Sequence, residues 1–186
     1  MCIRTYLLPA AVCAAFLCCG TLFAQQTPSR SRMEAGLQSS FKGVGATVIL
    51  QGKQGATGEL RLLADFADIL MGHTARPGTR IQYLQHFPVH RFDLSNELTI
   101  NIVWGPGVTL GLVRDKRKQG GYLAAVSGFA GAEFIFHRVP VTVSTSFSAD
   151  LGAHMTIRNR YDNTMTYYEY GLRRAWYPEI GIRYRF

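Results

Sequence analysis

Cysteine and lysine are scarce in this sequence, and cysteine is absent after residue 19. All four cysteines (Cys2, Cys13, Cys18 and Cys19) lie in the first nineteen residues. A chain that loses this segment has no disulfide framework and no cysteine-based metal site or nucleophile. Lysine occurs at four positions (Lys42, Lys53, Lys116 and Lys118), each beside glycines or charges in a predicted turn. Despite the net charge of +8, there is no basic helix and no basic run interleaved with aromatics, so nucleic acid is not an expected partner.

The first 24 residues have the layout of a secretory signal peptide. A single charge, Arg4, precedes an apolar run from "LLPAAVCAAFLCC" to "GTLFA", and polar "QQTPSRSR" follows. We expect residues 1–24 to be removed after Ala24, leaving one domain over residues 25–186 with a net charge of +7. A transmembrane anchor is one alternative, because Tyr6 to Ala24 is long enough to span a bilayer. A lipoprotein is another, because three cysteines lie in or after the apolar run.

Three long segments alternate with a two-residue period. From Val139 to Met155 the odd positions carry mostly apolar residues and the even positions carry mainly small polar ones, and residues 98–113 and 122–136 repeat the pattern. Strands usually have about five or six residues, so these are unusually long. The less apolar faces hold Gly, Ser, Thr and Asn without lysine, whereas a soluble β-protein exposes Lys and Glu there. The pattern therefore predicts apolar faces toward lipid and polar faces inside a barrel. A soluble periplasmic β-protein is the remaining alternative.

Turn residues divide the chain into eight predicted strands, an even number that suits an antiparallel up-and-down transmembrane barrel. The predicted strands are Ser31–Phe41, Val44–Gln51, Glu59–Leu70, Arg80–Val89, Leu98–Val113, Tyr122–Phe136, Val139–Met155 and Arg174–Phe186. The stretch "ELRLLADFADILM" also fits a helical period. We interpret it as a strand, because a helix there would leave an odd number of strands and an unclosed barrel.

Charged side chains on the inner faces are close to balanced in sign. We expect them to form a buried plug of ion pairs and hydrogen bonds, since eight strands enclose a lumen that side chains fill and not a transport pore. The predicted inward residues are Glu34, Arg61, Asp65, Arg80, Glu133, Asp150, Glu179, Arg183 and Arg185.

The chain ends in "WYPEIGIRYRF", which alternates up to a terminal aromatic residue. One face carries Trp176, Ile180, Ile182, Tyr184 and Phe186. Ten residues of tilted strand cover roughly 25 Å, about the height of an apolar band with aromatic girdles. The terminal Phe resembles the signal by which outer-membrane barrels are recognised for assembly, so this face is predicted to be both membrane anchor and assembly signal.

Two further functions have candidate residues. The predicted last outer loop holds tyrosines and arginines that suit a binding surface, or else a belt at the lipid head groups: Tyr161, Tyr167, Tyr168, Tyr170, Arg173 and Arg174. Asp150 and His154 share the inner face of one strand with serines, which suits a lipid-modifying enzyme. Four strand positions span about 13 Å, so any triad would need residues from other strands. No cofactor or metal is expected.

The central part of the chain contains "VWGPG", then "GFAGAEFIF", a short "VP" turn and "VTVSTSFSADL". In these segments it resembles a family of small outer-membrane barrel proteins common in Bacteroidota. It implies an eight-stranded barrel in the bacterial outer membrane, and no general activity or catalytic residue. We therefore expect a structural or interaction-mediating protein. Its expected partners are outer-membrane lipids, lipopolysaccharide, the barrel-assembly machinery and a protein bound at the outer loops. A lipid A acyl hydrolase or acyltransferase-like enzyme is the alternative.

Overall fold

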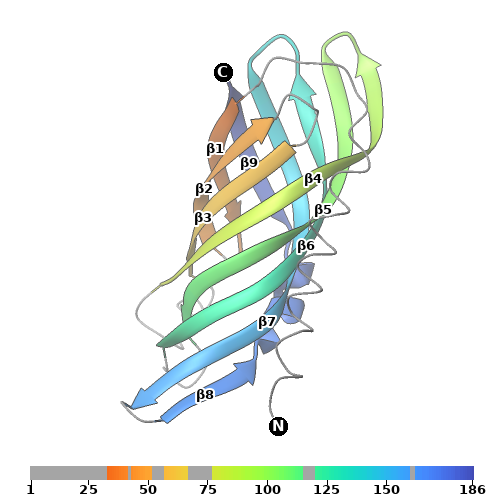
Figure 1. Ribbon diagram of the computed structural model, residues 1–186. Coiled ribbons are helices and arrows are strands. Elements are labelled where there is room, and N and C mark those ends of the chain that lie inside the picture. Colours follow the sequence, from red (N-terminus) through yellow and green to blue (C-terminus); the bar gives the residue numbers. More distant parts are fainter. Residues whose placement is uncertain (1–32, 42, 52–56, 67–76, 115–119, 160–161) are drawn as a thin grey trace.

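The computed structural model describes residues 33–41, 43–51, 57–66, 77–114, 120–159 and 162–186, so the predicted signal peptide lies outside the described residues. These residues form nine strands and two short helical segments (Figure 1). The elements are β1 (Met33–Ser40), β2 (Gly43–Gln51), β3 (Thr57–Asp65), β4 (Gly78–Ser95), β5 (Leu98–Arg114), β6 (Gly120–Phe136), β7 (Val141–Asn159), β8 (Asp162–Tyr167), α3 (Glu169–Arg173), η1 (Arg174–Trp176) and β9 (Glu179–Arg185).

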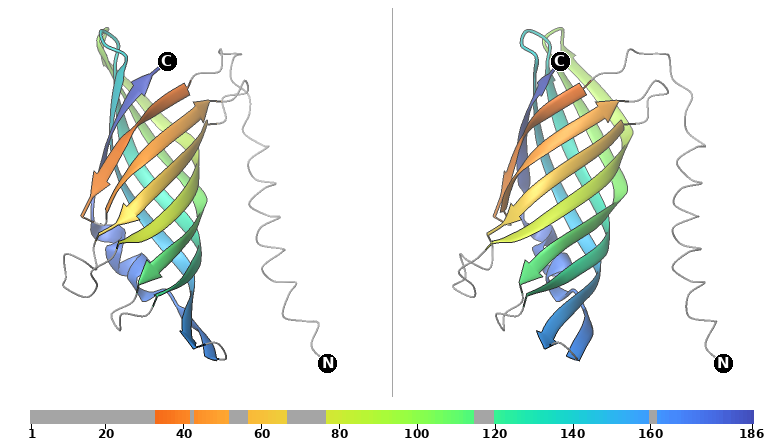
Figure 2. Two further views of the ribbon diagram at one scale, coloured as in Figure 1. Left: turned by 90° about the vertical axis from the view of Figure 1, so that its left-hand side faces the viewer. Right: turned by 60° about the vertical axis from the view of Figure 1, so that its left-hand side comes forward.

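The sheet closes into an eight-stranded antiparallel barrel (Figure 2). Strands β1 to β7 pair in sequence order, and β9 completes the ring by pairing with both β7 and β1. Tyr184 marks this closure, because it lies opposite Val141 on one side and Ala35 on the other. The predicted eight-stranded barrel is confirmed. The ninth strand, β8, pairs with β7 and lies outside the ring.

Strand β7 pairs with two different strands on the side away from β6. The first six residues of β7, from Val141 to Ser146, pair with β9, whereas the stretch from Ala153 to Asn159 pairs with β8. The predicted last strand was therefore wrong at its start, because residues 174–176 form a 3-10 helix and the strand begins at Glu179. Pro178 has no N–H to give to a ladder, which is consistent with a strand that begins just after it.

Strand β4 is longer than predicted and includes most of the expected connection "HRFDLSN". It continues to Ser95, and the turn consists of Asn96 and Glu97 because Ser95 lies opposite Leu98. The pairing with β5 shifts register between Pro88 and His90. A bulge accommodates the missing N–H of proline within a strand, so the chain continues beyond it.

The stretch with both helical and strand periodicity is a strand as far as Asp65. Residues Thr57–Asp65 form β3, in which Glu59, Arg61 and Asp65 are buried while Leu60 and Leu62 are exposed. The rest of the predicted strand, residues 67–70, lies outside the described residues. The strand prediction is confirmed for Thr57–Asp65.

The barrel places apolar side chains outside and polar side chains inside. Leu37, Leu110 and Ile182 are each about 60% exposed, at 67%, 60% and 59%, whereas Thr47, Glu59 and Arg61 are no more than 3% exposed. This sidedness is the reverse of a water-soluble barrel, and it follows the predicted alternation. Within the described ranges, no helix has the length and apolarity that a membrane span requires.

The β4–β5 and β6–β7 hairpins are joined at their tips, at the end of the barrel where the chain terminates (Figure 1). The Thr99 hydroxyl donates to Asp93 Oδ1 at 2.7 Å and lies 2.8 Å from His137 Nε2, and Arg138 forms an exposed ion pair with Glu97. The hydroxyl of Thr99, and then the guanidinium of Arg91, lower the pKa of Asp93. These contacts stabilise two hairpins that are otherwise open to solvent.

Candidate functional site: the polar interior of the barrel

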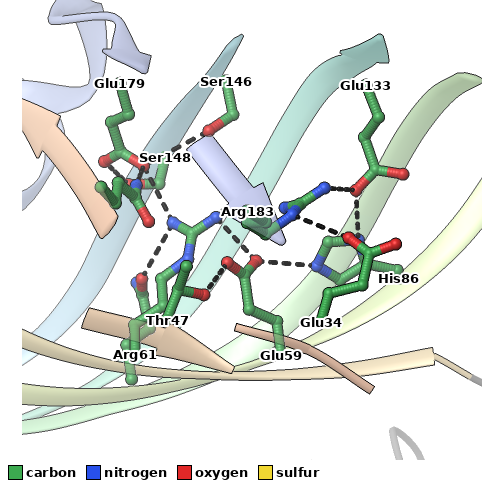
Figure 3. Close-up of polar contacts among 12 residues, drawn as sticks. Glu34, Thr47, Glu59, Arg61, His86, Glu133, Ser146, Ser148, Glu179 and Arg183 are labelled. Carbon is green, nitrogen blue, oxygen red and sulfur yellow. Dashed lines mark hydrogen bonds and ion pairs between the residues drawn. The ribbon is translucent and has the colours of Figure 1, made fainter. Parts of the chain in front are cut away.

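Arg61 lies at the centre of the barrel interior and binds two carboxylates (Figure 3). Its guanidinium is 2.8 Å from Glu59 Oε2 and 2.9 Å from Glu179 Oε2, and its own side chain is 3% exposed. Gln38 and Ser148 each donate to Glu179 at 2.6 Å, while Thr47 donates to Glu59 at 2.5 Å. Both buried carboxylates are thus paired with a charge and supplied with further donors, which buried ions require.

His86 connects the cluster around Arg61 to the end of the barrel where the C-terminus lies. Its Nε2 lies 2.8 Å from Glu59, and its Nδ1 lies 3.6 Å from Glu133. Glu133 in turn accepts from Arg183 at 2.6 Å, and Arg183 also reaches Glu34 at 3.1 Å. The ring of His86 packs on Phe129 with 4.5 Å between centroids. Acidic and basic side chains therefore alternate through this part of the lumen.

A second cluster occupies the end near α3 and η1. Asp65 binds both Arg174 at 2.8 Å and Arg80 at 3.3 Å, and Arg80 also contacts Asp150 at 3.3 Å. Asp150 accepts from the hydroxyls of Ser127 at 2.6 Å and Thr109 at 3.0 Å. The helical segment thus inserts a cation into the barrel from the position where a strand would otherwise complete the wall.

The side chain of Gln82 joins the two clusters. Its amide oxygen accepts from Arg61 at 3.4 Å and its amide nitrogen donates to Asp150 at 3.4 Å. The space between the clusters, beside Gln38, Arg80 and Glu179, has a volume of about 10 Å³, about enough for one water. The interior described here is a side-chain-filled, salt-bridged core, as the sequence predicted.

The predicted inward residues lie in this core with one exception. Arg185 lies at the rim, where it donates to the carbonyl oxygens of Phe136 and Val139. Glu59, His86 and Arg174 also belong to the core, although they were not among the predicted inward residues. Strand parity could have identified Glu59 and His86, because they share an inner face with Arg61 and Arg80 respectively. Parity could not identify Arg174, which the helical segment directs inward.

Asp150 and His154 are both buried, and no hydrogen bond between them is present in the described part of the chain. Asp150 is bound by Arg80 and by two hydroxyls. His154 is 3% exposed, and its Nε2 has no hydrogen-bond partner in the described ranges. The same atom lies 2.5 Å from where a Cβ on Gly121 would be, so the absence of a side chain at Gly121 makes room for this ring.

The six predicted outer-loop residues are distributed over different environments. Tyr167 in β8 is 51% exposed and Arg173 in α3 is exposed, as a binding surface requires. Tyr168 is 4% exposed and packs with Leu123 and Ala125, and Arg174 is buried against Asp65. Tyr161 and the side chain of Tyr170 lie outside the described residues.

Among the residues described, no three His, Cys, Asp or Glu side chains gather in a way that could hold a metal ion.

The predicted anchor residues face outward, but they do not share one strand. Ile180, Ile182 and Tyr184 are each at least half exposed on β9, and the ring of Tyr184 lies 5.1 Å from that of Phe186. Trp176 belongs to η1 and is 84% exposed. The prediction that Trp176 and Phe186 lie on one face of a continuous strand was wrong.

The ion pair between Arg174 and Asp65 predicts how firmly the helical segment is held. In Arg174→Ala, Asp65 keeps Arg80 as a partner, so we expect the barrel to stay closed. The segment 169–176 loses its buried tether, and we expect its amides to exchange at least about tenfold faster, as for a locally opening unit. Hydrogen exchange measured by mass spectrometry checks this, with Arg173→Ala on the exposed side of α3 as control. Equal exchange rates in the two variants would contradict the tether.

Comparison with known proteins adds no relative to this description. Neither the models of known protein families nor the curated proteins give a match to this chain.

Proposed function

We propose that this protein is an integral barrel of the bacterial outer membrane. The observation that carries the proposal is the sidedness of the wall, in which leucine, isoleucine and valine side chains are exposed around the barrel and ionic side chains are buried. A band of this kind is unfavourable in water, where exposed apolar patches on monomers rarely exceed a few hundred Å². In a bilayer it is favourable, and a closed ring satisfies the backbone groups by strand pairing.

The two ends of the barrel suggest an orientation. The C-terminus lies at the same end of the barrel as the turns formed by Asn96–Glu97 and by residues 137–140 (Figure 2). The opposite end carries α3, η1 and the β7–β8 hairpin. Outer-membrane barrels have short periplasmic turns and longer outer segments. We infer that the terminus lies on the periplasmic side, after export directed by residues 1–24, and that β8 and α3 face the outside.

Within this proposal the protein is structural or mediates interactions at its outer end, and does not transport solutes. The filled lumen supports that role, because charged side chains occupy the space that a channel would need. The exposed side chains of Tyr167 and Arg173 are candidates for contact with lipopolysaccharide or a protein partner. Assembly machinery would recognise β9 and Phe186, as in the Bacteroidota barrels that the chain resembles.

Lipid modification stays an untested prediction. It requires His154 to act on lipid with Asp150, and loss of a lipid A modification in His154→Ala would support it. No described contact of either residue favours it over a structural role.

Heat-modifiability on a gel tests the membrane proposal. We expect the unheated protein to migrate faster than the heated one and to be in the outer-membrane fraction. Deletion of Phe186 should abolish both properties, because it removes the terminal aromatic residue of the predicted assembly signal, whereas Phe186→Trp should keep them. A soluble periplasmic product without a heat shift would show that the proposal is wrong.

A further inference from the structure

Strand β8 has one open edge. It is the last strand in the order of the sheet, and within the described ranges β7 is its only strand partner. In Figure 1 it lies on the side of β7 away from the barrel body, at the end opposite the chain terminus. A row of backbone N–H and C=O groups along such an edge can pair with another extended chain.

The pairing with β7 shows which backbone groups are open. Tyr168 donates its N–H to the carbonyl of Gly152 at 2.9 Å. Hydrogen-bonded residues alternate along an antiparallel pair, so Thr166 and Thr164 also direct their backbone groups toward β7. The N–H and C=O groups of Asn163, Met165 and Tyr167 therefore point toward the open edge.

This edge is short, at six residues, and its pairing with β7 shifts register beside Asp162, but it lacks the residues that most often protect edge strands from pairing. Natural edges usually carry lysine, proline, a bulge or an inward-pointing charge. Strand β8 has the sequence DNTMTY, without lysine or proline, and its one charge is at its first residue. Met165 is 69% exposed and Tyr167 is 51% exposed. The side chains of Met165 and Tyr167 are thus exposed, and so are the backbone groups along this edge of the strand.

We propose that two copies of this protein bind each other through the open edges of β8. An antiparallel two-fold arrangement centred on Met165 places Met165 opposite itself and Asn163 opposite Tyr167 of the second copy. All three residues with open groups then form hydrogen-bonded pairs, so the register satisfies the whole edge. Such an interface is isologous, since each copy contributes the same surface.

The side chains of β8 are compatible with this register. It places Thr164 opposite Thr166 of the second copy, a cross-strand pair that stabilises antiparallel sheets. Asp162 lies beyond the paired residues, so the register opposes no like charges. The inference rests on the proposed function in one respect, namely that β8 lies at the outer end, where it is free to meet a second copy.

A substitution at Met165 separates backbone pairing from side-chain contact. Met165→Pro removes one open N–H without removing a bond to β7, and proline is tolerated on the open side of an edge strand. Met165→Ala removes the side chain but keeps the N–H. In detergent, light scattering should give twice the chain mass for the wild type and Met165→Ala, and the single-chain mass for Met165→Pro. A monomeric wild type, or a dimeric Met165→Pro, would overturn the proposal.

Hydrogen exchange provides a second test on the unmodified protein. Dilution to monomer should speed exchange of the Met165 and Tyr167 amides by about tenfold or more, while the Thr164 and Thr166 amides, bound to β7, should not change. Equal responses at all four amides would contradict edge pairing. The heat shift is measured on the same samples, so a barrel that shifts but does not dimerise disproves only this inference. A chain without a heat shift disproves the membrane proposal instead.

Discussion

Replacing Arg61 with alanine should lower the free energy of unfolding by about 3–5 kcal/mol, because it leaves two buried carboxylates without their shared cation. Glu59 and Glu179 are 1% and 5% exposed in their side chains and lie within 2.9 Å of this guanidinium. The hydroxyl and amide donors that remain on these carboxylates do not replace a full positive charge. Urea unfolding in detergent, followed by tryptophan fluorescence, measures the difference.

The control for this prediction is an ion pair that is open to solvent. Arg138 pairs with Glu97 at the hairpin tips, where the side chains are 77% and 51% exposed. Arg138→Ala should change the free energy of unfolding by no more than about 1 kcal/mol, as is typical of surface pairs. Equal losses for Arg61→Ala and Arg138→Ala would mean that the interior pairs do not stabilise the barrel.

Substituting Gly105 with alanine should destabilise the barrel by about 3 kcal/mol, the upper end of the usual cost of overpacking. A Cβ at Gly105 would lie 1.6 Å from the carbonyl oxygen of Gln85, a backbone atom of the neighbouring strand. The clash cannot be relieved by rotating a side chain, so β5 must move away from β4. That movement would also disturb His86, which follows Gln85 on β4 and packs on Phe129.

Gly128 is the matched control, because a Cβ there would meet nothing within 4 Å. Gly128→Ala should be neutral or stabilise the barrel by up to about 1 kcal/mol, since alanine loses less backbone entropy on folding. The same unfolding experiment compares both variants. A Gly105→Ala barrel as stable as the Gly128→Ala barrel would show that the two strands can separate at low cost.

The two-residue period of the sequence was enough to predict the barrel and which face of each strand is apolar. Where Leu60, Arg61 and Leu62 alternate, a single correct assignment of strand parity fixed which side chains lie inside. Parity also explains why most of the predicted inward charges were right. It contains no information about partners, so the sharing of Arg61 between Glu59 and Glu179 emerged only from the structure.

The last wall position was not predictable from the period, because it is not a continuous strand. Residues from Tyr168 to Pro178 interrupt the alternation with a helical segment that packs against β7. A Cβ at Gly171 would lie 1.9 Å from the Asp150 carbonyl oxygen, so this contact needs a glycine. A lone glycine in a tyrosine- and arginine-rich stretch suggests a loop, and its close approach to β7 depends on residues about twenty positions earlier in the chain.

Strand β9 contributes Glu179 and Arg183 to the lumen, and their partners Arg61 and Glu34 precede them in the chain by 118 and 149 residues. A chain that ends before Glu179 would therefore lack partners for three side chains of the lumen. Arg61 and Gln38 would lack Glu179, and Glu133 would lack Arg183. The ion pairs and hydrogen bonds of the lumen are complete only when β9 is in place. Such a chain would also lack the strand that closes the sheet between β7 and β1.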